Sequence, residues 1–129
     1  MNAPSLRIET VQHNDITVFR PIGWVGHDNH HVLDERLMAL VDKGQRRIVV
    51  DLSMVHLVSS TGMGVFLFYR QALEEKGGCL ILAAPSAEVW KMLSAAGLTR
   101  ALEICTTVKE ALSRAGRHVD SGRLEPIKS

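Results

Sequence analysis

The chain has few aromatic residues, almost no net charge and no long apolar run. Aromatic residues occupy 5% of its 129 positions, and the formal net charge is +1. A nearly neutral chain offers no electrostatic reason to bind nucleic acid or an anionic membrane. No apolar run approaches the roughly 18 residues of a membrane span, and the first residues lack the pattern of a signal peptide. We therefore expect a cytoplasmic protein with no nucleic-acid or membrane partner.

Side chains that bind metals or form disulfides are also scarce. The two cysteines, Cys79 and Cys105, each lie in an apolar, strand-like run, and their spacing fits neither a metal site nor a redox motif. We expect them to be small buried hydrophobic side chains. His27, His30 and His31 could place two imidazoles on one helical face, but a metal site needs further ligands in a closed geometry. We expect solvated histidines, no metal and no cofactor.

The chain does have the size and apolar content of one globular domain. Hydrophobic residues make up 46% of the sequence and charged residues 22%, and a chain of this length can bury a core without disulfides or metals. We expect the domain to cover residues 1–116. Residues 117–129 are polar and without periodicity, so we expect a flexible C-terminal tail there.

The alternation of apolar and polar residues predicts the order of the elements. Segments 6–11 and 15–20 alternate with period two around the turn residues QHND, which predicts a β-hairpin. Further strands are expected over residues 46–53, 79–85 and 101–105. Helices are expected over about 28–44, 60–76, 86–97 and 107–116. Strands that alternate with helices predict parallel pairing. The fold class is therefore α/β, with one mixed sheet and four helices on one face or both.

The segment HLVSSTGMGVFLFYR, residues 56–70, gathers three hydroxyl residues at an expected helix start. We expect Ser60 to be the N-cap, where unpaired N–H groups and the helix dipole favour negative charge. The segment is compatible with a plain capping site, a nucleotide phosphate loop, a serine nucleophile or a phosphorylation site on an interaction surface. It lacks the Lys-Ser/Thr pair of a P-loop and the flanks of a nucleophile elbow, which disfavours the second and third interpretations.

Two glycines and a methionine follow the hydroxyls. Gly62 and Gly64 each cost up to about 1 kcal/mol relative to alanine in a helix. They permit either close packing of the helix on the sheet or close approach of another molecule. Met63, between them, is expected to be either a core side chain or an exposed, adaptable apolar contact. Two roles are likewise compatible with Trp24, a side chain at the edge of the core or an interface anchor.

The segment RRIVVDLSMVHLVSSTGMGVFLFYRQALEEKGGCLILAAPSAEVWKMLSAAGLTRALEI resembles the STAS domain of bacterial anti-sigma factor antagonists. An apolar strand ends in Asp-Leu-Ser, and a Ser-Thr-Gly-Met-Gly-Val loop and helix follow. A Gly-Gly turn then leads into a strand, and a helix ending in Gly-Leu precedes a short last strand. The resemblance covers about residues 6 to 115. It implies a small mixed sheet with helices packed largely on one side.

The resemblance also implies a role as a switchable binding protein that is not an enzyme. Ser60 corresponds to the serine that the family's partner, an anti-sigma factor serine kinase with a histidine-kinase-like ATPase fold, phosphorylates. Unphosphorylated protein binds that kinase and frees a sigma factor, and a metal-dependent serine phosphatase resets the phosphorylated form. Ser59 and Thr61 are rival acceptors. The implied partner surface comprises Ser59, Thr61, Gly62, Met63, Gly64, Asp28 and Trp24.

Two departures from the family pattern affect this interpretation. Family members usually have Asp where this chain has Ser59, which removes a negative charge beside the acceptor. The loop GWVGHDNHH, residues 23–31, is longer than the family's Gly-x-Leu-Asp, and Asp28 is its nearest equivalent acid. An alternative is a STAS accessory subunit bound constitutively to a transporter or signalling complex, with the loop as unmodified contact surface. A small-molecule-sensing or scaffold STAS domain is a third interpretation.

Overall fold

Residues 6–127 form a mixed β-sheet flanked by helices. The computed structural model describes the backbone of these residues and the side chains of residues 6–117. The strands are β1 (Arg7–His13), β2 (Ile16–Val25), β3 (Arg47–Asp51), β4 (Val55–Val58), β5 (Cys79–Ala83) and β6 (Glu103–Cys105). The helices are α1 (His30–Asp42), α2 (Ser60–Glu75), α3 (Ala87–Ala95) and α4 (Val108–Ile127).

The sheet has the strand order β1-β2-β3-β5-β6, with β4 paired to the far end of β2. Strands β1 and β2 form the expected antiparallel hairpin, closed by a tight turn at Asn14 and Asp15. Asn14 has a φ of 57°, a left-handed conformation that asparagine tolerates better than most residues. The remaining pairs, β2–β3, β2–β4, β3–β5 and β5–β6, are parallel. The predicted α/β class with one mixed sheet is confirmed.

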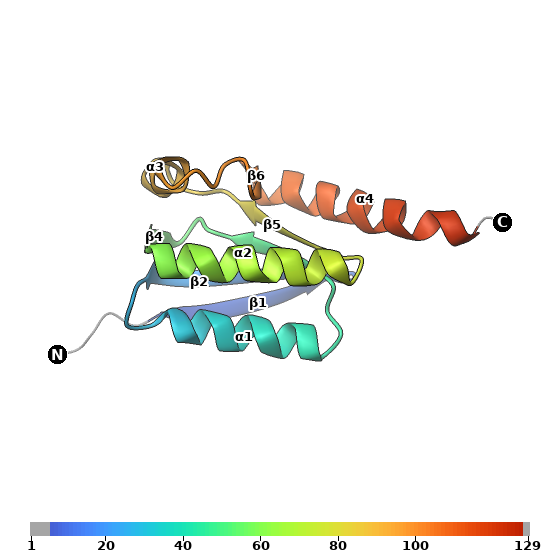
Figure 1. The fold of residues 1–129 in the computed structure, drawn as a ribbon, viewed down its shortest axis with the longest axis horizontal. Coiled ribbons are helices and arrows are strands. Elements are labelled where there is room, and N and C mark those ends of the chain that lie inside the picture. The colour runs from blue at the N-terminus through green and yellow to red at the C-terminus, as the bar shows by residue number, and fades with distance from the viewer. Residues whose placement is uncertain (1–5, 128–129) are drawn as a thin grey trace.

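The helices lie on both faces of the sheet, three on one and one on the other (Figure 1). Leu33 of α1, Phe66 of α2 and Leu93 of α3 are fully buried in one continuous core. Ala111 and Ala115 of α4 pack in a separate, smaller core on the opposite face. The expectation of helices packed largely on one side is confirmed. Small alanines let α4 lie close to the sheet.

The sequence pattern missed one strand and shortened another. β4 spans only four residues, of which Val55 and Val58 are buried while the two between them are exposed. This pattern is too short to separate a strand from an apolar loop by periodicity. β2 continues to Val25, past the expected end at residue 20, so Trp24 lies in a strand rather than in a loop. A register shift between Gly23 and Trp24 accompanies its pairing with β4.

The last helix is longer than the sequence pattern indicated. We expected an end at Gly116, but α4 continues through this glycine to Ile127. Glycine in a helix interior costs only about 1 kcal/mol relative to alanine, so it need not end a helix. The flexibility expected for residues 117–129 stays a prediction.

Hydroxyl side chains cap the last two helices. Ser86 accepts a hydrogen bond from Val89 N over 3.1 Å, and Thr107 accepts one from Glu110 N over 3.0 Å. Cys79 and Cys105 are buried free thiols, as expected. Burial raises the pKa of both thiols, to about 12 for Cys79.

Candidate functional site

Two loops meet at the carboxyl-terminal edge of the parallel strands. One joins β2 to α1, and the other joins β4 to α2. The Ser59 N–H donates a hydrogen bond to the Val25 carbonyl over 2.8 Å, which fixes the start of α2 beside the end of β2. Asn29 holds the first loop, since its Oδ1 accepts from Gly26 N over 2.8 Å and its Nδ2 donates to the Trp24 carbonyl over 3.1 Å. These hydrogen bonds fix the position of the hydroxyl cluster at this edge of the sheet.

Ser59, and not Ser60, is the N-cap of α2. Ser59 has an extended backbone (φ −75°, ψ 169°), and its Oγ accepts a hydrogen bond from Gly62 N over 3.2 Å. The same Oγ lies 2.8 Å from the Thr61 Oγ1. The expected N-cap role of Ser60 is wrong by one position. Serine and aspartate are both good N-cap residues, so Ser59 keeps a cap at the position where the resemblance leads us to expect Asp.

Ser60 is the first residue of α2 and is exposed to solvent. Its hydroxyl makes no hydrogen bond within the part of the chain that the structure describes. The backbone N–H groups of the first turn and the positive end of the dipole lie beside it, and this turn contains no acidic residue. Ser60 thus offers a free hydroxyl where added negative charge is favoured.

The two glycines of the first turn have different roles. A Cβ at Gly62 would lie 2.6 Å from Val25 Cγ1 and 3.1 Å from Val58 Cγ1, so this glycine lets α2 pack closely on the sheet. A Cβ at Gly64 would meet nothing within 4 Å. Met63 is 6% exposed and belongs to the core. Of the two roles left open for Met63, the core side chain is the one observed. The partner contacts expected at Gly62 and Met63 stay predictions.

A groove between α1 and α2 begins beside the hydroxyl cluster. It has a volume of about 420 Å³. Thr61 and Gly64 line its near end, and Met38 and Phe68 line it further along. The Phe68 side chain is 62% exposed and that of Met38 is 47% exposed. This apolar surface was missed from the sequence, although Phe68 falls outside the 3.6-residue stripe of buried side chains on α2 and could have been flagged on that basis.

The two helices that form the groove are joined by a hydrogen bond at its floor. The Tyr69 hydroxyl donates to Asp34 Oδ1 over 2.7 Å. Burial raises the pKa of Tyr69, and the neighbouring Asp34 carboxylate raises it further. The phenol therefore stays protonated and keeps its donor role at neutral pH.

Trp24 lies apart from the groove. Its neighbour Val25 is fully buried in the core beneath α1 and α2, and alternate residues of a strand face opposite sides of the sheet. Trp24 therefore faces the other side, where it is 43% exposed and paired across strands with Leu57. Asp28 is exposed in the β2–α1 loop. The structure brings residues 59–61 and Gly64 together and leaves Trp24 outside that surface.

His27 in the β2–α1 loop lies near His30, the first residue of α1. The His27 and His30 rings are 6.2 Å apart, and His30 Nδ1 lies 3.0 Å from the His27 carbonyl. Among the residues that the structure describes, no group of three or more His, Cys, Asp or Glu side chains is arranged to hold a metal ion.

The Asp-Leu-Ser sequence at the end of β3 stabilises the edge below the site. Asp51 accepts hydrogen bonds from Arg20 Nε and from Ser53 N, each over 3.0 Å. Burial acts to raise the pKa of Asp51, but the hydrogen bonds from Ser53 and the Arg20 charge outweigh it and lower the pKa. This aspartate is therefore an ionised structural group.

Comparison with known proteins agrees with this architecture. The family model described as the STAS domain matches residues 7–111. The anti-sigma F factor antagonist of Paenibacillus polymyxa is 27% identical over 113 residues, covering 84% of this chain and 94% of that protein. BtrV of Bordetella bronchiseptica is 31% identical over 93 residues, covering 72% of this chain and 79% of that protein.

Solved structures show the same fold. The anti-sigma factor antagonist SpoIIAA in its unphosphorylated form superposes with a TM-score of 0.71 at 24% identity, covering 88% of this chain and 97% of that one. The phosphorylated form of SpoIIAA from Bacillus gives a TM-score of 0.63 at 23% identity, covering 85% of this chain and 98% of that one. Within residues 6–127, no helix has both the length and the apolar character needed to cross a membrane. The match over residues 7–111, with the mixed sheet and helix arrangement described above, places this chain in the STAS domain family.

Proposed function

We propose that this chain is an anti-sigma factor antagonist that works as a cytoplasmic binding protein rather than an enzyme. Its unphosphorylated form binds an anti-sigma factor serine kinase and releases a sigma factor. Phosphorylation of Ser60 switches this binding off, and a metal-dependent serine phosphatase restores it. The observation that carries the proposal is the exposed hydroxyl of Ser60 at the start of α2, which makes no hydrogen bond with the described residues and lies beside an open apolar groove.

The position of Ser60 favours it over the two neighbouring hydroxyls as the phosphate acceptor. Ser59 accepts from Gly62 N and contacts Thr61, so its hydroxyl is occupied in capping α2. Modification of Ser59 would displace the cap, whereas modification of Ser60 leaves the cap in place. The N-cap function that the family's Asp supplies is also retained by Ser59, so the replacement leaves the loop conformation available to a kinase.

Phosphorylation at Ser60 should change binding without unfolding the domain. A phosphoserine carries a charge of about −1.5 to −2 at neutral pH, and the N-terminal turn of α2 accommodates it. A partner seated over Thr61, Gly64 and Phe68 would instead meet a bulky dianion at its edge. A loss of about 3 kcal/mol in binding free energy corresponds to more than a hundredfold loss of affinity.

The test is phosphorylation by the kinase encoded beside this protein's gene, or one that co-purifies with it. The protein is incubated with kinase and ATP, and the modified residue is mapped by mass spectrometry. We expect one phosphate, on Ser60. A protein that binds the kinase but carries no phosphate on residues 59–61 would contradict the switch.

Two variants separate the switch from constitutive binding. Ser60→Ala should keep the fold and bind the kinase whether or not ATP is present. Ser60→Asp should keep the fold, checked by circular dichroism, and bind at least tenfold more weakly. Equal binding by both variants and the wild type would instead support the accessory-subunit alternative, in which the loop is unmodified contact surface.

A further inference from the structure

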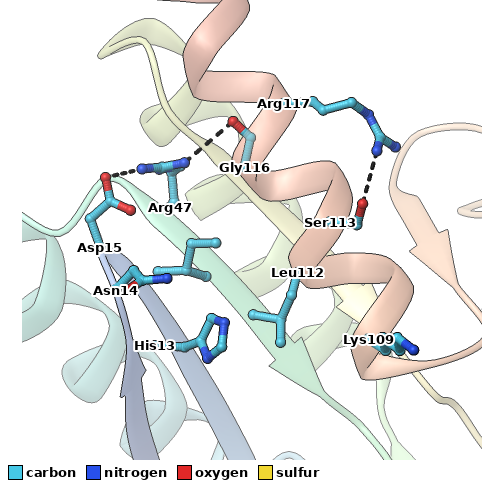
Figure 2. A pocket seen from close by; sticks show the side chains of 10 residues that line it. His13, Asn14, Asp15, Arg47, Lys109, Leu112, Ser113, Gly116 and Arg117 are labelled. Carbon is cyan, nitrogen blue, oxygen red and sulfur yellow. Dashed lines mark hydrogen bonds and ion pairs between the residues drawn. The ribbon is translucent and has the colours of Figure 1, made fainter.

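A second pocket lies between the β1–β2 turn and one side of α4 (Figure 2). We call it the hairpin–α4 pocket. It borders Ile16 and Arg47, the first residues of β2 and β3, whereas residues 59–61 lie beyond the other end of β2. Ten extended residues span about 30 Å, so the pocket is remote from the proposed switch. Its volume of about 520 Å³ suits a small molecule.

A central ion pair builds the pocket wall. Arg47 is 7% exposed and pairs with the Asp15 carboxylate from the hairpin turn. Its Nη1 also donates to the carbonyls of Ala115 and Gly116, over 3.3 and 3.5 Å. Figure 2 shows this guanidinium bridging the turn and α4. The Arg47 charge is thereby compensated, and its contacts link β3, the β1–β2 turn and α4 at the pocket wall.

Two further cations line the pocket without a compensating carboxylate. Lys109 and Arg117 form no ion pair with any described side chain, and Asp15, already paired with Arg47, is the one carboxylate among the lining residues. Arg117 Nη1 donates to the Ser113 hydroxyl over 2.8 Å, which folds this guanidinium back along α4 toward the Lys109 end. Lys109 lies in the first turn of α4, where the helix dipole disfavours positive charge. The pocket therefore carries a positive excess at one rim.

The rest of the lining combines the polar side chains of His13 and Asn14 with an apolar floor. Leu112 and Ile16 supply apolar surface, and Leu112 faces His13 across the pocket in Figure 2. Gly116 adds no side chain, and a Cβ there would meet nothing within 4 Å. A ligand with an anionic head and an apolar body would match both the cationic rim and this floor.

We propose that the hairpin–α4 pocket binds a small organic phosphate, with its phosphate on Lys109 and Arg117 and its apolar part on Leu112 and Ile16. The Ser113 oxygen accepts from Arg117, and its O–H donates to no group among the described residues, so it can donate to the phosphate. Such a ligand would bind independently of partner docking at Ser60, since the two sites lie at opposite ends of β2.

The probe is phenyl phosphate, titrated into the full-length, unphosphorylated protein and followed by ¹H–¹⁵N NMR. We expect saturable shifts confined to residues 13–16, Arg47 and residues 109–117. Inorganic phosphate alone should shift the same amides but bind at least fivefold more weakly, because it has no apolar part. Equal affinity for the two probes would show a plain anion site and overturn the organic component of the proposal.

Matched variants test the residues. Lys109→Gln combined with Arg117→Gln should weaken phenyl phosphate binding at least tenfold, whereas Lys91→Gln on the exposed face of α3 should leave it unchanged. Gly116→Leu places an apolar side chain in the pocket from a position where a Cβ meets nothing within 4 Å, so it should abolish binding while preserving the helical circular dichroism signal. Shifts spread over lysines and arginines elsewhere, or unchanged binding by the double variant, would overturn the proposal. None of these measurements involves the kinase, so failure here is separable from failure of the Ser60 switch.

Discussion

The Ser59 Oγ accepts a hydrogen bond from Gly62 N over 3.2 Å, whereas the hydroxyl of Ser60, one residue later, is exposed and makes no hydrogen bond in the part of the chain that the structure describes. The two adjacent serines thus have different roles. Ser59 caps α2, and Ser60 faces solvent at the first position of the helix. The division explains how a loop that must hold a helix start could also accept a modification.

This division predicts different costs for two alanine substitutions. Ser59→Ala removes the cap of α2 and should lower the free energy of unfolding by about 1 kcal/mol. Ser60→Ala removes no hydrogen bond and should change it by less than about 0.5 kcal/mol, as expected for a surface position. Urea denaturation measures both. Ser59→Asp serves as control, since aspartate also caps, and it should unfold close to the wild type; equal destabilisation by the two alanines would contradict the assignment.

The two glycines of the first turn give a second matched pair. Gly62→Ala places a Cβ 2.6 Å from Val25 Cγ1, and overpacking of this kind costs about 1–3 kcal/mol. Gly64→Ala meets nothing and should stabilise the helix by up to about 1 kcal/mol. In thermal denaturation, the melting temperature should therefore fall for Gly62→Ala and rise for Gly64→Ala. A loss of stability in Gly64→Ala would show that its surroundings are not open.

The strongly periodic parts of this fold were predictable, and the parts set by contacts between segments were not. The helical spacing of Leu33 and Leu37 predicts α1, and the continuous apolar run of β3 predicts a buried strand. β4 could not be found this way, because its four residues become a strand only by pairing with the end of β2. The length of β2 depends on the same pairing.

The site shows the same limit. The cluster of hydroxyls at the start of a helix could be predicted from the sequence. Which serine is the N-cap could not, because a shift of one residue changes the capping hydrogen bond but leaves the sequence pattern the same. Met63 and Phe68 are both apolar α2 residues, and only the direction of the helix relative to the sheet decides that Met63 is buried and Phe68 exposed. The groove arises from α1 and α2 together, so neither segment predicts it alone.

The Asp51–Arg20 ion pair gives a pH-dependent prediction. The folded pKa of Asp51 lies below its ordinary value of 3.8. The ionised form therefore stabilises the fold at pH values above about 3.8, and this contribution is lost as pH falls through the folded pKa. Asp51→Asn should cost about 1–3 kcal/mol at pH 7, because a buried acceptor of two hydrogen bonds becomes poorly matched.

The measurement is urea denaturation of wild type and Asp51→Asn between pH 7 and pH 3. The gap between the two proteins should be widest near neutral pH and should narrow as pH falls below about 4. Asp28→Asn, at an exposed position in the β2–α1 loop, is the control and should show no such gap. A gap that stays constant with pH would mean that the aspartate stabilises the fold by packing and not by its charge.

Cys79 gives the last prediction, on thiol reactivity. Burial first, and the nearby Glu103 charge second, raise its pKa to about 12 from 9.0. Because the thiolate is the reactive form, a rise of this size lowers the thiolate population at pH 8 by about a hundredfold or more. Native protein should therefore react very slowly with 5,5′-dithiobis(2-nitrobenzoic acid), and protein in 6 M guanidinium chloride should react within the mixing time.

Since the folded pKa of Cys79 is the higher one, the protonated thiol stabilises the fold below pH 9, and this contribution falls as pH rises from 9 toward 12. Cys79→Ala should lose that part of the alkaline pH dependence. A native thiol that reacts as fast as the denatured one would contradict the burial of Cys79 in the smaller core beneath α4.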